Sequence, residues 1–234
     1  MSNFIEFSNV SKVYTIGTSK INALDGISFA INKGEFVVIL GPSGSGKTTL
    51  LNLLGGMDKL SSGDIFVDTS CLSQFGSRQM TYYRRHNVGF VFQFYNLMPN
   101  LTARENIELA TEICNNALPT DDILDKVMLL DRAKNFPSQL SVGEQQRVSI
   151  ARAVAKNPKL LLCDEPTGAL DYETGKVILK LLHDICKTQN KTVILVTHNV
   201  ALKEMADKVI SIKNGKVTNV FINPTPQDIS DIEW

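Results

Sequence analysis

The stretch that decides the fold is Gly41-Pro42-Ser43-Gly44-Ser45-Gly46-Lys47-Thr48-Thr49. It matches the phosphate-binding pattern GxxxxGK[ST] in full. Glycines let backbone N–H groups point inward at phosphate oxygens, and the following helix directs its positive end at the same anion. Lys47 carries positive charge to the β- and γ-phosphates, and the Thr48 hydroxyl is a hard oxygen ligand for Mg²⁺. The stretch therefore predicts a site for a nucleoside triphosphate with magnesium.

The segments on either side of this loop have the periodicity that such a site requires. Residues 36–40 (FVVIL) form a continuous apolar run, typical of a strand covered on both faces, and the leucines at 50–54 suit a helix packed on the sheet. Two more buried strands are predicted at 160–163 and 192–196, with a helix around 174–188 between them. A helix between two such strands indicates parallel βαβ units. The predicted class is an α/β P-loop fold.

The rest of the chain predicts smaller lobes around this core. Short strands are expected at residues 5–7, 10–14, 27–31 and 88–92, of which 27–31 has the alternation of an antiparallel edge. Residues 102–136 predict a mostly helical insert, and helical spacing returns from 141 to 155. After Val220 the chain is polar, acidic and broken by proline, so we expect this tail to pack loosely.

Composition and charge narrow the class of protein. The 234 residues include 24 Lys+Arg and 24 Asp+Glu, and this balance gives no global support for binding to nucleic acid or anionic lipid. No apolar run approaches the ~20 residues that span a bilayer, and residues 1–10 lack the features of a secretory signal, so we expect a soluble, cytosolic protein. The four cysteines and three histidines lack the spacing of zinc or redox motifs, which predicts reduced thiols.

Two predicted strands end in candidate catalytic side chains. The strand at 160–163 is followed by Asp164 and Glu165. The first carboxylate can hold magnesium through water, and the second can orient or deprotonate an attacking water. The strand at 192–196 is followed by Thr197-His198, whose imidazole could reach the γ-phosphate from the same edge of the sheet. Adjacent acids and a lone histidine are each often structural, but their position after a complete phosphate loop favours catalytic roles.

The stretch Leu140-Ser141-Val142-Gly143-Glu144-Gln145-Gln146-Arg147 resembles the LSGGQ signature of ATP-binding cassette (ABC) transporters, and it too precedes a predicted helix. From about Ile5 to Val217 the chain resembles the nucleotide-binding subunit of that family. The implied fold is a RecA-like core with an N-terminal antiparallel β-subdomain and an inserted α-helical subdomain. The expected lobes are residues 1–35 (antiparallel β), 36–98 and 159–220 (core), 99–158 (helical, with the signature) and 221–234 (C-terminal tail).

The resemblance also implies roles for individual residues. Gln93 matches the Q-loop glutamine, residues 168–171 match the D-loop that ends in Asp171, His198 matches the switch histidine and Tyr14 matches the aromatic that stacks on adenine. A core tyrosine is the alternative for Tyr14. The expected catalytic residues are Glu165, His198 and Gln93, and the expected metal ligands are Thr48, Gln93 and Asp164. The expected nucleotide-binding residues are Tyr14, residues 41–49, Ser141, Gly143, Glu144 and Asp171.

The signature implies a shared site. By resemblance, the Ser141 hydroxyl and the Gly143 N–H face the γ-phosphate bound to a second chain, so that ATP holds two copies in a homodimer. Glu144 is a familiar substitute for the signature's glutamine. Val142 departs from the pattern, which has glycine there, and a β-branched residue disfavours positive φ and adds bulk beside phosphate. We expect ordinary helical or extended backbone at Val142, where valine costs little.

Within the family, the chain most resembles the MacB/LolD-like type of macrolide export, antimicrobial-peptide resistance and lipoprotein release. The segments that carry this resemblance are residues 14–17, 23–26, 54–58 and 89–99. It implies an FtsX/MacB-like permease, with or without a periplasmic or extracellular adaptor protein, and a location on the inner face of the cell membrane. The implied function is export of a drug, an antimicrobial peptide or a lipid-linked substrate.

Residues 94–101 would form part of the groove that receives the permease's coupling helix, unless their aromatics pack into the helical lobe. Two other functions stay open. An FtsE-like cell-division ATPase, which regulates wall hydrolases through its permease, shares every motif. A non-transport ABC ATPase is the second, although that class usually carries a long coiled-coil insertion or a second cassette.

Overall fold

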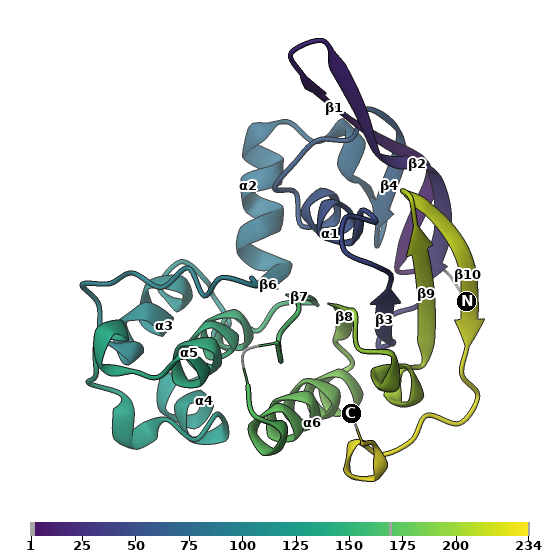
Figure 1. The fold of residues 1–234 in the computed structure, drawn as a ribbon. Coiled ribbons are helices and arrows are strands. Elements are labelled where there is room, and N and C mark those ends of the chain that lie inside the picture. The colour runs from purple at the N-terminus through teal and green to yellow at the C-terminus, as the bar shows by residue number, and fades with distance from the viewer. Residues whose placement is uncertain (1–2, 169, 234) are drawn as a thin grey trace.

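The computed structural model describes residues 3–168 and 170–233 (Figure 1). Its centre is a six-stranded sheet with the order β10-β9-β3-β8-β7-β6. The strands are β3 (Phe36–Leu40), β6 (Val88–Val91), β7 (Leu160–Asp164), β8 (Thr192–Thr197), β9 (Lys208–Lys213) and β10 (Lys216–Ile222). All neighbours pair in parallel except β9 and β10. The order places the carboxyl ends of β3, β8 and β7 side by side, which is where open parallel sheets bind ligands.

The two faces of the central sheet are buried by different elements, because side chains alternate along a strand. On β3, Phe36 and Val38 pack into a cluster with the apolar residues of α5 (Val142–Ala155) and α6 (Tyr172–Gln189). The intervening Val37 and Ile39 pack instead against α1 (Lys47–Leu54) and the antiparallel sheet. Figure 1 shows α1 and α6 on opposite sides of this sheet. The predicted α/β class is confirmed.

The second sheet is antiparallel and has the order β2-β1-β4-β5. Its strands are β1 (Ile5–Ile16), β2 (Ser19–Ile31), β4 (Ser62–Val67) and β5 (Ser70–Cys71). The two short strands expected near the N-terminus are one strand, β1, whose register shifts between Phe7 and Val10. Residues 62–71, expected in the central lobe, belong here instead, because Ile65 and Val67 face the apolar side of β1 and β4 pairs with it. The other lobe boundaries stay a prediction.

The inserted lobe is helical, as expected, and lies at the left of Figure 1. It contains α3 (Ala103–Thr111) and α4 (Thr120–Lys126), both packed on α5. Before it, α2 (Ser77–His86) leads into β6. Short 3₁₀ turns occur at Leu72–Gln74, Leu130–Arg132, Pro137–Gln139, Val200–Met205 and Ile229–Asp231. Across the described ranges 3–168 and 170–233, no helix combines the length and the apolar character needed to cross a membrane.

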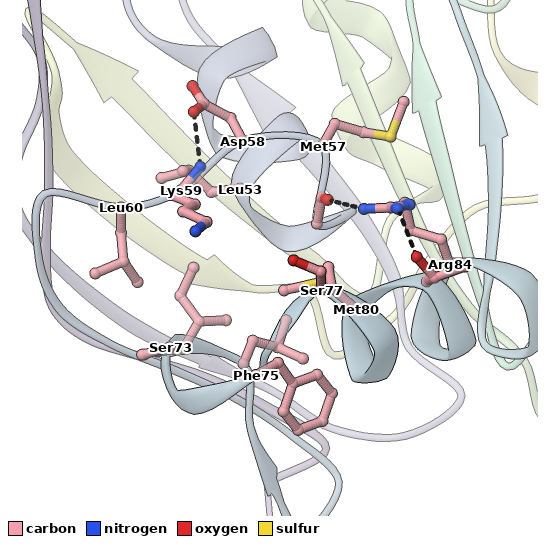
Figure 2. Close-up of a pocket in the computed structure, with 14 residues that line it drawn as sticks. Leu53, Met57, Asp58, Lys59, Leu60, Ser73, Phe75, Ser77, Met80 and Arg84 are labelled. Carbon is pink, nitrogen blue, oxygen red and sulfur yellow. Dashed lines mark hydrogen bonds between the residues drawn. The ribbon is translucent and has the colours of Figure 1, made fainter.

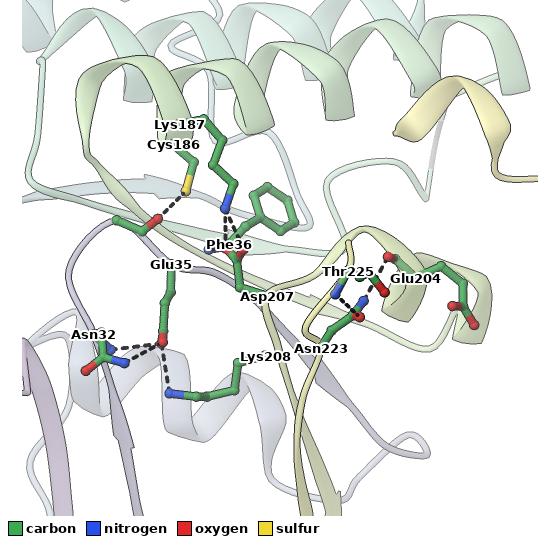
Figure 3. Close-up of polar contacts among 11 residues, drawn as sticks. Asn32, Glu35, Phe36, Cys186, Lys187, Glu204, Asp207, Lys208, Asn223 and Thr225 are labelled. Carbon is green, nitrogen blue, oxygen red and sulfur yellow. Dashed lines mark hydrogen bonds and ion pairs between the residues drawn. The ribbon is translucent and has the colours of Figure 1, made fainter. Parts of the chain in front are cut away.

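Polar contacts that range from exposed to largely buried fix the amino ends of β3 and β9 (Figure 3). One Asp207 carboxylate oxygen accepts the Phe36 backbone N–H at 2.6 Å and the Lys187 ammonium at 2.6 Å. The buried Lys208 ammonium lies 2.8 Å from the Glu35 carboxylate and donates to the Ala30 carbonyl at 2.9 Å. These pairs lie at the end of the sheet opposite to the phosphate loop. They hold the strands in register without entering the site.

The four cysteines are unpaired thiols, as the spacing predicts. Burial raises the pKa of the Cys163 thiol to about 12, and burial likewise raises the pKa of Cys186 to about 12. A raised pKa keeps a thiol protonated and unreactive at neutral pH. We therefore assign no chemistry to these two buried residues.

The C-terminal tail is largely exposed over residues 221–228 but packs on the core at its end, so the expectation of loose packing is wrong for the last residues. Ile229 and Ile232 are buried in the same core cluster as α6, because one 3₁₀ turn places both on the same side. The Tyr172 hydroxyl donates to the Ile232 carbonyl at 3.2 Å, and Lys176 donates to the Ser230 carbonyl at 3.1 Å. Figure 1 shows this yellow turn beside α6. Two isoleucines therefore anchor a polar segment.

We expect the Ile232→Ala variant to lower the free energy of unfolding by about 2–4 kcal/mol, the usual cost of truncating a buried isoleucine. Urea denaturation of the full chain measures this. The matched control is Ile222→Ala, because Ile222 is 67% exposed on β10 and its truncation should change stability by less than about 0.5 kcal/mol. Equal effects of the two substitutions would contradict the docking of the tail.

Candidate nucleotide site

The phosphate loop joins β3 to α1 and turns tightly where its glycines lie. Gly44 and Gly46 have φ angles of 75° and 105°, in the left-handed region that favours glycine. A Cβ on Gly46 would lie 2.4 Å from the Ala23 carbonyl oxygen, and one on Gly41 would lie 2.2 Å from the Ile212 carbonyl oxygen. No side chain fits at either position. The loop is thus a bare backbone turn at the start of a helix, as an anion site requires.

Lys47 lies back over this loop. Its ammonium donates to the carbonyls of Gly41 at 2.8 Å and Pro42 at 3.0 Å, and its side chain is mostly buried. A cation held by backbone carbonyls at the mouth of the loop is placed to meet incoming phosphate oxygens. Among the remaining loop residues, the Ser45 hydroxyl is buried and has no hydrogen-bond partner within the described part of the chain.

Thr48 and Asp164 are brought together from α1 and β7. The Thr48 hydroxyl donates to the Asp164 carboxylate at 2.8 Å. Burial raises the pKa of Asp164, and the nearby Glu165 charge also raises it, while the Thr48 hydrogen bond and Lys47 lower it. A hydroxyl and a carboxylate are the hard oxygen donors that Mg²⁺ takes beside phosphate and water. Within residues 3–168 and 170–233 no cluster of three His, Cys, Asp or Glu could hold a metal by itself. The donor set fits a magnesium ion that arrives with a nucleotide.

Glu165 is held at the same sheet edge by two neighbours from β8 and the residue after it. Its two carboxylate oxygens contact the Thr197 hydroxyl, which donates at 3.1 Å, and the His198 Nδ1 atom at 2.8 Å. The Asn199 backbone N–H in turn donates to the Thr197 hydroxyl at 3.0 Å. Glu165 has φ 48°, a left-handed conformation that non-glycine residues adopt at a cost and that is frequent at functional sites.

A cavity of about 490 Å³ joins these groups. This volume lies in the range of small-molecule sites. Its lining includes the expected residues Ser43, Gly44, Lys47, Thr48, Gln93, Asp164, Glu165 and His198, and also Phe94, Tyr95, Gln146 and Gly168. The loop, both acids, the histidine and the glutamine therefore meet at one place, although they lie far apart in the sequence.

Gln146 is a residue that the sequence did not assign. It is buried on α5, its amide nitrogen donates to the Pro166 carbonyl at 3.1 Å, and its amide oxygen has no partner among the described residues. Pro166 follows Glu165, so Gln146 connects the signature helix to the segment that carries Glu165. The available signal was a polar residue at a position that helical spacing assigns to the mostly apolar, buried side of α5.

Tyr14 lies on β1, outside the lining of this cavity. Its hydroxyl donates to Asp58 at 2.7 Å, and the Lys12 ammonium lies 4.7 Å from its ring centre and 2.7 Å from the other Asp58 oxygen. Burial and the bond to Asp58 raise the pKa of Tyr14. Asp58 also lines a second cavity of about 420 Å³, where Arg84 donates to the Gly56 carbonyl at 2.7 Å (Figure 2). Adenine stacking by Tyr14 stays a prediction.

The signature residues lie at the exposed start of α5, also outside the cavity. The Ser141 hydroxyl accepts the Glu144 backbone N–H at 3.2 Å, and the Glu144 carboxylate accepts the Ser141 N–H at 2.7 Å, which forms a capping box. The Ser141 N–H lowers the pKa of Glu144. The chain therefore does not bring Ser141, Gly143 or Glu144 to its own phosphate loop.

The D-loop is described only in part, because Ala169 lies outside the described residues. Gly168 lines the cavity. Asp171 caps α6 by accepting the Thr174 backbone N–H at 3.0 Å, which lowers the pKa of Asp171. A nucleotide contact of Asp171 stays a prediction.

Comparison with known proteins decides the family. The sequence pattern of the family described as ABC transporter matches residues 24–168, more than half of the chain. This chain belongs to the ABC transporter family. An ABC transporter ATP-binding protein of Methanocaldococcus jannaschii is 42% identical over 225 residues, which cover 91% of this chain and 94% of the relative. By family and by fold, the molecule is an ABC ATPase cassette.

Solved structures of ABC cassettes have the same fold. The chain superimposes with a TM-score of 0.88 on the ATP-binding cassette MJ0796, described as a dimeric post-hydrolysis state bound to ADP and Pi, at 39% identity over 93% of this chain and 98% of that one. It superimposes with a TM-score of 0.80 on cbiO1 of Clostridium perfringens, described as part of the ABC transporter complex cbiONQ, at 28% identity over 94% of this chain and 88% of that one. A Mycoplasma pneumoniae relative is 44% identical over 235 residues, or 99% of this chain, which spans about half of that relative's length.

Val142 has the ordinary backbone that we expect for this cassette. It is the first residue of α5, its φ is not among the positive values, and its side chain is 54% exposed. Because helical backbone does not need glycine, valine fits here. We expect the Val142→Gly variant to hydrolyse ATP within about twofold of the wild-type rate and to lose up to about 1 kcal/mol of stability through helix propensity. Steady-state ATPase assays test this, with Val142→Ala as the control, and a large rise in rate for glycine alone would contradict it.

Proposed function

We propose that this chain is the ATP-binding and ATP-hydrolysing subunit of an ABC transporter. The observation that carries the proposal is the position of Glu165, held by Thr197 and His198 in the same cavity as Lys47 and the Thr48–Asp164 pair. A fixed carboxylate facing a phosphate loop can take a proton from water, and a bare loop with a buried lysine can bind the triphosphate.

The proposed reaction is in-line hydrolysis. Residues 41–49 bind the triphosphate. Thr48, Asp164 and Gln93 would hold Mg²⁺, which would neutralise charge on the phosphates. Glu165 orients a water and accepts its proton as the water oxygen attacks the γ-phosphorus. The bond from that phosphorus to the bridging oxygen breaks, and ADP leaves with the electron pair. His198 and Gln93 hold the γ-phosphate and the nucleophile.

We further propose that the active unit is a head-to-tail homodimer. Ser141 is exposed and Gly143 is partly exposed, and both lie outside their own chain's cavity, which leaves them available to complete the site of another copy. The start of α5 offers N–H groups and a hydroxyl, which suit a γ-phosphate. The dimeric state of the cassette MJ0796 supports this arrangement.

The proposed partner is an integral-membrane permease of FtsX/MacB-like type, with this subunit on the cytoplasmic face of the membrane. A groove of about 370 Å³ runs between α1, α2 and β6 on one side and α3 and α5 on the other. Phe90, Phe92, Met57 and Ala110 give it an apolar lining, which suits a docked helix. The substrate that we propose for the transporter follows from the same resemblance: a drug, an antimicrobial peptide or a lipid-linked molecule.

The segment expected in that groove is divided between two sites. Asn96 lines the groove, while Phe94, 77% exposed, and Tyr95 line the nucleotide cavity. Leu97 packs against the helical core, so one of the expected groove residues does pack inward. A segment that touches both cavities is suited to report the nucleotide state to the permease.

Co-purification from detergent-solubilised source membranes tests the groove. We expect Ala110→Glu to reduce recovery of the permease by more than about tenfold, because a much larger side chain would fill the groove where the permease helix docks, and to leave nucleotide binding intact. The matched control is Leu109→Glu, an exposed residue of α3 outside the groove lining. Equal recovery of both variants would exclude the groove, and a partner without a large extracytoplasmic domain would exclude the MacB-like assignment.

A further inference from the structure

The charges of this neutral chain are unevenly distributed. Residues 69–104 contain no Asp or Glu, although acids flank the segment at Asp68 and Glu105. The same segment contains four arginines, at positions 78, 84, 85 and 104. This local excess of positive charge does not appear in the net charge, because the whole chain has 24 basic and 24 acidic residues. Three of the four arginines lie on α2.

The helix α2 sorts its residues into a buried and an exposed side. Positions 78, 82 and 85 follow the i, i+4, i+7 spacing of one helix face, and Arg78, Tyr82 and Arg85 are all exposed. The buried Tyr83 fixes the opposite side, because its hydroxyl donates to the Leu54 carbonyl at 2.9 Å and its ring packs edge-on against Phe75. The helix is therefore anchored with its basic face outward.

Arg78 and Arg85 have no carboxylate partner within the described residues. Arg84 differs, since it donates to the Gly56 carbonyl and the Thr81 hydroxyl and so serves the fold. Between the two unpaired arginines lies Tyr82, which is 64% exposed and packs its ring 4.4 Å from that of His86. An exposed aromatic ring between two guanidinium groups without carboxylate partners indicates a binding surface.

We propose that the outer face of α2, formed by Arg78, Tyr82 and Arg85, binds the anionic phospholipid headgroups of the membrane that holds the permease. Guanidinium groups pair with phosphate through two parallel hydrogen bonds, and tyrosine is enriched at the headgroup level of bilayers. Arg78 and Arg85 lie on the outward face of α2 and line neither the groove nor the 420 Å³ cavity. They therefore suit a broad surface better than a peptide segment. This rests on the proposed function only in placing the subunit at a membrane.

Vesicle co-sedimentation of the full chain tests the proposal. We expect binding to phosphatidylcholine vesicles that contain about two-fifths phosphatidylglycerol, little binding to phosphatidylcholine alone, and weakening by salt. The double variant Arg78→Gln/Arg85→Gln should lower the partition coefficient about 30-fold, the effect of removing two surface arginines from an anionic membrane contact. Lys33→Gln/Lys134→Gln removes the same charge from exposed lysines elsewhere and should bind like wild type. The ATPase rate in detergent-free solution should be unchanged in both.

Two outcomes would overturn the proposal. The first is a failure of the vesicle assay: either the wild-type chain does not bind the anionic vesicles, or the arginine variant binds them as well as the lysine control does. The other is an arginine variant that binds the vesicles normally but no longer co-purifies with the permease, which would show that this face binds an acidic protein segment instead. Because the vesicles contain no permease, failure here is distinct from failure of the proposed function.

Discussion

The Glu165→Gln variant is expected to hydrolyse ATP about 10²- to 10⁴-fold more slowly than the wild type, the usual contribution of a positioned general base. Glutamine has nearly the same shape and keeps an oxygen that can accept the Thr197 hydroxyl at this position. It cannot take a proton from water. The loop and the Thr48–Asp164 pair are untouched, so binding of MgATP should survive the loss of chemistry.

Two measurements on this variant separate binding from hydrolysis. Steady-state phosphate release gives the rate, and size-exclusion chromatography with MgATP shows whether an undissociated dimer accumulates because its ATP is not consumed. The control is Glu173→Gln, an exposed carboxylate in the first turn of α6. An undiminished rate in Glu165→Gln would exclude Glu165 as the catalytic carboxylate.

The parts of the site that the sequence predicts are those encoded by local pattern. The runs of consecutive apolar residues in β3, β7 and β8 indicate buried parallel strands, and neighbouring parallel strands end at a common edge of the sheet. The residues after each run, at positions 41–49, 164–165 and 197–198, are therefore expected to converge. In the structure they do, within one cavity.

The features of the fold and the site that could not be predicted from the sequence depend on contacts between distant segments of the chain. Nothing local shows that Ile65 and Val67 face β1, or that Ile229 and Ile232 in a polar tail reach the core. The left-handed backbone of Glu165 is equally hidden, because it is imposed by its neighbours in the folded state. Burial of these groups is a property of the assembled sheet, which periodicity within one segment cannot encode.

The shared site makes its own prediction, because each chain would need a second copy to complete its nucleotide cavity. Lys47→Ala should remove the loop's cation, and Ser141→Arg should place a bulky side chain where the γ-phosphate of the other copy would meet α5. We expect each variant alone to lose more than about 99% of its ATPase activity, the scale of removing one preorganised phosphate contact. Thr102→Arg is the matched control, because Thr102 caps α3 through the same capping box but has no expected phosphate contact.

Mixing the two inactive variants then decides whether Ser141 acts across the dimer. A mixed dimer would carry one doubly damaged site, in which the substituted loop of one chain faces the substituted signature of the other. Its second site would be intact, with the native Lys47 loop of one chain facing the native Ser141 of the other. If the chains exchange at random, half of the dimers are mixed and each has one of two sites, so the mixture should recover about a quarter of the wild-type rate, provided that the sites act independently. If Ser141 served the phosphate loop of its own chain, every site would keep one defect and mixing would restore nothing. That result would overturn the shared site while leaving the fold and the catalytic role of Glu165 intact.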